Sequence, residues 1–301
     1  RQMCIRDRGK RKEKTSFSFK GIWRYLLRRQ TIGMIFFMAC FFSLKESEIF
    51  VDRNQSLLYD VLIRGRTEWG ESGIFSTAVY QMASITNMNA WLVMFLPFLL
   101  AYPYVITVCD DYQSHFIRST MIRKGFYPYV RDCYQYGIIS MAVIGSISLI
   151  LYTLFCVITC DLLSALNVEN QQMLYRVICG KAALRVGRSS GMYYVLPVLT
   201  GYIRMLCAFL ISGLLSVLGM AWSKNKYFSL CMPCLVYYLL IRTSETLVDN
   251  GVEIGQYLSP MQLVQNEIPI WLLLLVTAGI VIVAERIFIW MMGREVDRGA
   301  C

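Results

Sequence analysis

Six apolar stretches follow one another along the chain, and each is long enough, or nearly long enough, to cross a bilayer as a helix. The clearest, 137–160, runs for 24 residues without a charged side chain, whereas about 20 residues suffice to cross the hydrocarbon core. Lipid cannot hydrogen-bond bare backbone, and the stretches lack the alternating pattern of a membrane barrel, so they predict helices. The sequence thus predicts an all-α, polytopic membrane protein with six transmembrane helices. We place these spans at about 31–48, 88–109, 137–160, 203–222, 227–242 and 268–292.

Two of the six spans have short apolar cores. The stretches 31–44 and 227–241 hold 14 and 15 residues. Each must therefore recruit flanking residues, or cross a thinned or tilted region.

The fourth span has an ambiguous beginning, because Arg204 interrupts an apolar run that starts before it. Either Arg204 lies within the membrane, or it marks the end of a short outer segment, 193–203, that dips toward the bilayer. Pro197 and Gly201 are expected to break that segment, so we favour the second interpretation.

The charge of the chain predicts an orientation. Only 17% of its residues are charged and 56% are hydrophobic, whereas a soluble domain carries about 25% charged residues. With the amino terminus inside, the inner segments carry 19 Lys and Arg residues and the longer outer segments carry 9. This excess predicts a plasma-membrane protein with both termini in the cytoplasm. The net charge of +10 then favours contact with anionic lipid headgroups over nucleic-acid binding.

The amino-terminal region divides into two parts. Residues 1–8 resemble translated sequencing adapter, and setting them aside leaves 16 basic residues inside against 9 outside. Residues 9–30 are basic and amphipathic, which is typical of a helix in the inner headgroup layer and equally of a plain orienting flank. Residues 31–301 form a single transmembrane domain.

Few residues suit catalysis or metal binding. The chain has one histidine, His115. Catalytic sites that use a membrane-embedded histidine as the base, and zinc sites that use histidine ligands there, are therefore not expected. Cys231 and Cys234 form a CxxC within an apolar span, but without a second pair we interpret them as packing thiols. No GxxxxGK[ST] loop is present to hold nucleotide phosphates.

Two ionisable residues, Arg204 and Glu285, are the candidate polar groups inside the membrane. Glu285 and its neighbour Arg286 point about 100° apart on a helix. Arg286 can extend to the membrane surface, and Glu285 is expected to face other helices. A structural contact between helices is favoured over contact with a substrate.

The most specific sequence joins the second and third spans, at 110–131. Apolar residues such as Phe116 and Ile122 lie there among charges, which predicts a short amphipathic helix on the cytoplasmic surface. Such a helix could dock in a partner's groove, although a solvated turn fits the same pattern.

This segment and the layout of spans resemble the permease subunits of type-2 ABC transporters, in their six-span bacterial form. The matching residues are Asp110, Asp111, Tyr112 and Ser114 in the first part, and Arg123, Tyr129 and Arg131 in the second. The chain departs from the family pattern where His115 replaces a usual Gly, where Asp111 replaces Glu, and where Cys133 lies near an expected Lys.

The resemblance implies that 110–131 is a coupling segment seated on a separate ATPase subunit. Its expected contacts are Asp110, Asp111, Tyr112, Ser114, Arg123 and Tyr129. ATP and Mg would bind to that partner, with no cofactor on this chain, and a second permease copy or paralogue would complete the path. The resemblance favours an exporter subunit that is not itself an enzyme. The alternative is a polytopic membrane protein without transport activity, such as a sensor, an accessory subunit or an intramembrane enzyme.

Overall fold

The computed structural model describes residues 29–44, 56–64, 76–86, 90–114, 120–121, 123–161, 192–251 and 269–297. Within these ranges the regular elements are helices, which confirms the predicted all-α fold for this part of the chain. The predicted amphipathic segment 9–30 lies outside the described residues except for its last two, and so does His115.

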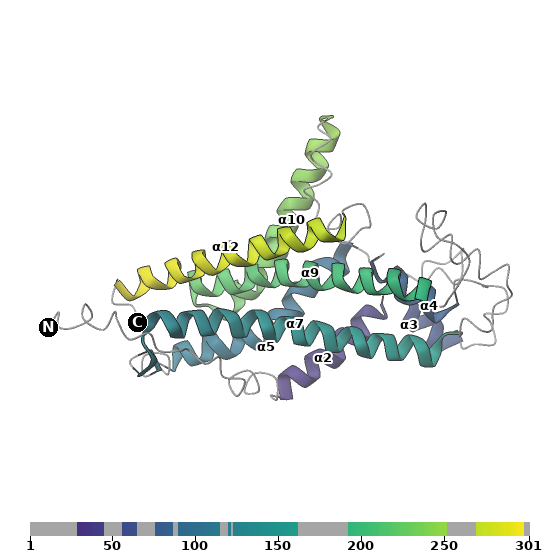
Figure 1. Cartoon of the computed structure of the whole chain (residues 1–301), viewed down its shortest axis with the longest axis horizontal. Helices are drawn as coiled ribbons and strands as arrows, with labels where there is room; N and C mark the ends of the chain where they lie inside the picture. The colour runs from purple at the N-terminus through teal and green to yellow at the C-terminus, as the bar shows by residue number, and fades with distance from the viewer. Residues whose placement is uncertain are drawn as a thin grey trace.

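A long helix occupies each of the six predicted apolar stretches (Figure 1). They are α2 (Arg29–Phe42), α5 (Ala90–Gln113), α7 (Phe126–Thr159), α9 (Met192–Ser223), α10 (Lys226–Asp249) and α12 (Ile270–Asp297). Short helical pieces lie between α2 and α5: α3 (Leu57–Tyr59), the π-helical turn η1 (Asp60–Arg64), α4 (Ala78–Ala83) and the 3-10 turn η3 (Ser84–Thr86).

Three of the described helices are long and apolar enough to cross a membrane: Phe126–Thr159, Val198–Ser223 and Ile270–Arg294. Gln30–Phe42 is a shorter apolar helix. These helices mark the chain as a membrane protein. The helices α5 and α10 lie where spans were predicted, and a total of six crossings stays a prediction.

The expected break within 193–203 is wrong. The helix α9 begins at Met192 and runs through Pro197 and Gly201 to Ser223 without a break. Proline is tolerated in membrane helices where neighbouring groups satisfy the freed backbone, and the apolar run favours continuing the helix. As a consequence Arg204 lies inside α9, and only 6% of its surface is exposed.

Several helices extend beyond the predicted spans. The helix α5 continues to Gln113 and α7 begins at Phe126, so the first residues of the predicted coupling helix are the last turn of α5 instead. Charged residues do not stop a helix once it leaves the hydrocarbon, which explains the difference. We call this end of the bundle, defined by 110–113 and 126–131, the motif end.

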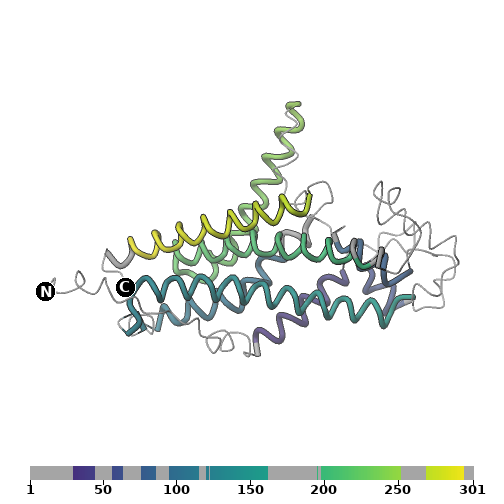
Figure 2. The backbone as a smooth tube through the Cα atoms, in the orientation of Figure 1, coloured from purple at the N-terminus to yellow at the C-terminus, as the bar shows by residue number. Residues whose placement is uncertain are grey.

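The helix α9 is the centre of the packing and contacts α5, α7, α10 and α12, while α2 lies against α7 and α5 (Figure 2). Small residues allow these helices to approach closely. A Cβ atom on Gly213 of α9 would lie 2.3 Å from the Sδ of Met141 on α7. In lipid, where apolar side chains gain little by leaving the solvent, such close packing is a main source of helix association.

The contact between α5 and α7 is built on Tyr104 and Gly137. A Cβ atom on Gly137 would lie 2.8 Å from the ring of Tyr104. The hydroxyl of Tyr104 donates a hydrogen bond to the backbone carbonyl of Cys133, one turn earlier in α7. Both Tyr104 and Gly137 are buried, so the ring lies directly against the backbone of α7.

The helix α10 lies beside α9 and α5 in its first part and then projects away from the bundle (Figure 1). Pro233 lies within it, and the residues after Tyr238 are mostly exposed. Near its end Arg242 forms an ion pair with Glu245, with Nη1 and Oε2 3.0 Å apart.

At the end of α7 opposite the motif end, part of the first predicted outer segment packs against the bundle. The helix α4 contacts α7 and α9, and Tyr152 of α7 donates a hydrogen bond to the carbonyl of Gln81 at 3.1 Å. A single parallel bridge joins Thr77 to Asp161. Of the other predicted outer residues, the structure describes 56–64, with α3 and η1, and 243–251 at the end of α10, while 45–55, 65–75, 162–191 and 252–267 lie outside the described ranges.

We expect Gly137→Ala to destabilise the protein, because the new methyl group would push the Tyr104 ring out of its place. Overpacking of this kind costs about 1–3 kcal/mol. The measurement is the unfolding midpoint in detergent. Gly279→Ala on α12 is the matched control, since a Cβ there meets nothing within 4 Å. Equal midpoints for the two variants would contradict the assigned contact.

Candidate functional site

The structure gathers the two parts of the predicted coupling motif at one end of the bundle. Asp110, Asp111 and Tyr112 form the last turn of α5, and Tyr129 lies in the first turn of α7. Ser114 follows α5 directly, and its hydroxyl donates a hydrogen bond to the carbonyl of Asp111 at 3.2 Å.

Arg123 lies in a short helical stretch just before α7, and its side chain is exposed. Gly125 separates this stretch from α7 with a φ of 86°, a conformation that glycine adopts without steric cost. Lys124 then reaches over the turn to Asp132, with Nζ and Oδ2 3.4 Å apart. Residues 115–119 and 122 lie outside the described ranges, so the middle of the predicted amphipathic helix stays a prediction.

The end of α5 is joined to the turn between α9 and α10 by two lysines. The Nζ of Lys226 lies 3.6 Å from Oδ1 of Asp110, and the Nζ of Lys224 lies 4.8 Å from the centre of the Tyr112 ring. Half-exposed ion pairs are weak singly, and a cation over an exposed ring contributes about 0.5–1 kcal/mol. Together they connect the motif to two further helices.

The beginning of α7 is joined to α12. The Nε of Arg131 lies 3.1 Å from Oε1 of Glu285. Three residues further along α7, Tyr134 donates a hydrogen bond to the carbonyl of Val281 at 2.6 Å, and its ring packs on Phe288 with centroids 5.6 Å apart. In the structure Glu285 of α12 thus faces α7, with Arg131 of the motif as its partner.

Arg204 is not part of this site. It lies on α9 nineteen residues before Ser223, and at 1.5 Å per residue this places it about 28 Å from the end of that helix. Of the two predicted intramembrane ionisable residues, Glu285 belongs to the motif end and Arg204 does not.

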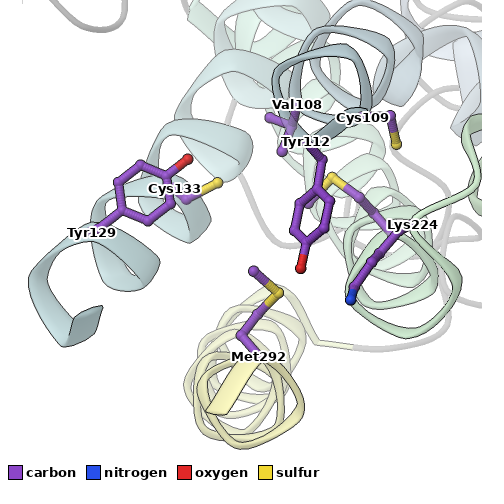
Figure 3. A pocket seen from close by; sticks show the side chains of 8 residues that line it. Val108, Cys109, Tyr112, Tyr129, Cys133, Lys224 and Met292 are labelled. Carbon is purple, nitrogen blue, oxygen red and sulfur yellow. The ribbon is translucent and has the colours of Figure 1, made fainter. Parts of the chain in front are cut away.

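A small hollow lies between the helices at the motif end (Figure 3). Two of the predicted coupling residues, Tyr112 and Tyr129, line it, and Lys224 lies beside Tyr112. Its other lining residues are apolar or carry sulfur and come from α5, α7, α9 and α12: Val108, Cys109, Cys133, Met220 and Met292.

Sequence reasoning found the acidic and aromatic residues of this site but missed the roles of Lys224 and Lys226. From the sequence alone, both contribute only to the charge that predicts the orientation. The signal that marks them is their position, since two lysines lie in the short turn between two apolar stretches, where the helices α9 and α10 return to the motif end.

Compared with known protein families, with curated proteins and with solved structures, the chain matches none. In the part of the chain that the structure describes, no group of three or more His, Cys, Asp and Glu side chains is placed to hold a metal ion.

The pair between Arg131 and Glu285 predicts a charge-swap result. Arg131→Glu or Glu285→Arg alone places like charges side by side and should lower the unfolding midpoint, whereas the double exchange should restore most of it. Because 61% of the Arg131 side chain is exposed, the coupling energy from the double-mutant cycle should be at most about 1 kcal/mol.

The exchange of Arg242 and Glu245 is the matched control, because that pair lies within one helix and both side chains are exposed. Its single and double changes should alter the midpoint little. A coupling energy of zero between positions 131 and 285 would show that the two charges do not interact in solution.

Proposed function

We propose that this chain is the permease subunit of an ABC transporter in the plasma membrane. The six long helices α2, α5, α7, α9, α10 and α12 cross the bilayer, and both termini lie in the cytoplasm. A separate ATPase subunit binds ATP and Mg and contacts the permease at 110–131, and a second permease copy or paralogue completes the transport path.

One observation carries this proposal: the motif residues gather at one end of the bundle and are tied there to the neighbouring helices. Asp110 contacts Lys226 of α10, Tyr112 contacts Lys224, and Arg131 contacts Glu285 of α12. A segment that receives force from a partner needs such connections, because a solvated turn would move without moving the helices.

Aromatic side chains at the motif end support its position at a membrane surface. Trp222, Trp290, Tyr127 and Tyr227 lie near the ends of α9, α12, α7 and α10 that meet there, and each is more than half exposed. Trp and Tyr prefer the headgroup layer, where their rings are part apolar and part polar. Together with the excess of Lys and Arg, this favours the cytoplasmic side for the motif end.

The proposed mechanism uses the ends of α5 and α7 as the receiving element. Closure of the ATPase pair would push 110–131, tilt α5 and α7, and change which side of the membrane the path opens to. Pro97 and Pro103 lie inside α5 and are sites where that helix can bend. Thr107 donates a hydrogen bond to the carbonyl of Pro103, one turn earlier in α5, at 2.8 Å.

The coupling role predicts that Asp111→Lys combined with Arg123→Glu uncouples the permease from its ATPase. Both side chains lie at the motif end, and reversing their charges should repel a complementary ATPase surface. We expect the permease-dependent change in ATP hydrolysis by the co-purifying ATPase to fall at least about tenfold, which corresponds to about 1.4 kcal/mol of lost coupling.

Reversal of Arg242 and Glu245 is the control, because these charges lie on the projecting part of α10. Insertion and the detergent unfolding midpoint should be unchanged in both variants. Hydrolysis that stays fully coupled after the changes at 111 and 123 would remove the assigned role and favour a membrane protein without transport activity.

The orientation predicts a labelling pattern. In a chain whose native cysteines have been replaced, a cysteine at position 114 should react with an impermeant maleimide only from the cytoplasmic side. A cysteine at position 171 should react only from outside. The opposite pattern would overturn the topology, while leaving the packing of the helices untouched.

A further inference from the structure

Sulfur-bearing side chains gather around the hollow at the motif end. They make up four of its eight lining residues, two cysteines and two methionines: Cys109, Cys133, Met220 and Met292. The whole chain holds 11 cysteines and 16 methionines among 301 residues, so the hollow is far richer in sulfur than the chain as a whole. The four residues come from four different helices, α5, α7, α9 and α12, and all are buried.

The size of the hollow limits what it can hold. Its volume is about 10 Å³, which is roughly the space that admits one water molecule. Figure 3 shows the sulfur-bearing ends of Cys133 and Met292 turned toward the space beside the Tyr112 ring. A single metal ion fits a space of this size, whereas an organic ligand does not.

The type of ligand selects the metal. Thiolate and thioether sulfur are soft ligands that together favour Cu(I), while Mg²⁺, Ca²⁺ and Mn²⁺ prefer oxygen. A structural zinc site needs four ligands, almost always Cys or His, and the hollow offers two cysteines and no histidine. The thioethers of Met220 and Met292 complete a set that His, Cys, Asp and Glu side chains do not form in the described part of the chain.

Binding of Cu(I) leaves the net charge of the hollow unchanged. Coordination removes the proton of one thiol, and this proton passes to the solvent. One positive charge therefore enters as another leaves. The ammonium group of Lys224, which lies 4.8 Å from the centre of the Tyr112 ring, gains no additional net charge to repel it.

A contact outside the hollow supports Cys133 as a ligand. The hydroxyl oxygen of Tyr104 lies 3.2 Å from the Cys133 sulfur, and the Tyr104 ring is held directly against Gly137. A hydroxyl group in this place can donate a hydrogen bond to a thiolate. Contacts of this kind orient metal ligands and stabilise their deprotonated form.

We propose that the hollow binds a Cu(I) ion. The thiolate of Cys133 and the thioethers of Met220 and Met292 are its ligands, and Cys109 supplies the remaining sulfur of the lining. The bound ion joins the beginning of α7 to α9 and α12 and so stabilises the motif end. The site requires neither the ATPase nor transport, so it holds or fails independently of the proposed function.

The test titrates the purified full chain with Cu(I) under anaerobic, reducing conditions, in competition with a chromophoric Cu(I) chelator. One tightly held ion per chain is expected, with sulfur ligands in its X-ray absorption spectrum and a raised unfolding midpoint. Cys133→Ser and Met292→Leu should each lower the affinity at least about tenfold, since even changes to residues that only support metal ligands cost 10–100-fold.

The replacement of methionine by leucine conserves volume, so Met292→Leu should leave the unfolding midpoint without metal almost unchanged. Met220→Leu provides the same test on α9. Met205→Leu is the matched control, because Met205 is equally buried on α9 but does not line this hollow.

Cys231→Ser is the second control, because it removes an exposed thiol of α10. Both controls should keep the full affinity for Cu(I). The proposal is overturned if the chain retains no Cu(I) against the chelator, or if Met292→Leu and Met220→Leu both bind it as tightly as the unchanged protein. Loss of binding in Cys231→Ser, or displacement of the bound copper by Zn²⁺, would equally overturn it.

Discussion

The close contact of Tyr104 with the backbone of α7 is the interaction on which the arrangement of the bundle depends. The aromatic ring lies against Gly137, and its hydroxyl is bonded to the carbonyl of Cys133, so α5 is fixed both across and along α7. Lipid offers no competing hydrogen bonds and little hydrophobic gain for association, so shape and a few polar contacts decide how helices pair. With α5 and α7 fixed, α9 packs against both, α10 packs on α9 and α5, and α12 packs on α9 and α7. The same contact sets the distance between the two ends of the motif.

The motif end shows how weak contacts can form a stiff structure. Each ion pair there is partly exposed and contributes little alone. However, they connect different helices: α5 is held to the turn before α10, and α7 is held to α12. The hydrogen bond from Tyr134 to Val281 lies one turn deeper and reinforces the second connection. A displacement of the ends of α5 and α7 would therefore be passed to both groups of helices.

The six bundle helices of the described ranges lie where the sequence predicted them, because long uncharged stretches leave few alternatives to a helix in lipid. It was less able to place their ends. The helix α9 includes Pro197, which local rules treat as a breaker, and α7 starts before Arg131 although a charge usually ends a span. Residues of the site that share a local pattern, such as Asp110 and Tyr112, were found. Contacts between residues far apart in the sequence were not found. No local sequence pattern indicates the contact of Lys224 with Tyr112 or that of Arg131 with Glu285.

The position of Cys133 makes its alkylation rate a measure of how often the helices around it separate. The eight cysteines of the described ranges are free thiols, and Cys133 is buried with its sulfur 3.2 Å from the Tyr104 hydroxyl, whereas Cys231 on α10 is exposed. In detergent, a small membrane-permeant alkylating reagent should react faster with the exposed Cys231 than with the buried Cys133. The ratio of the two alkylation rates, each measured on its own proteolytic peptide, then reports how often the bundle opens locally.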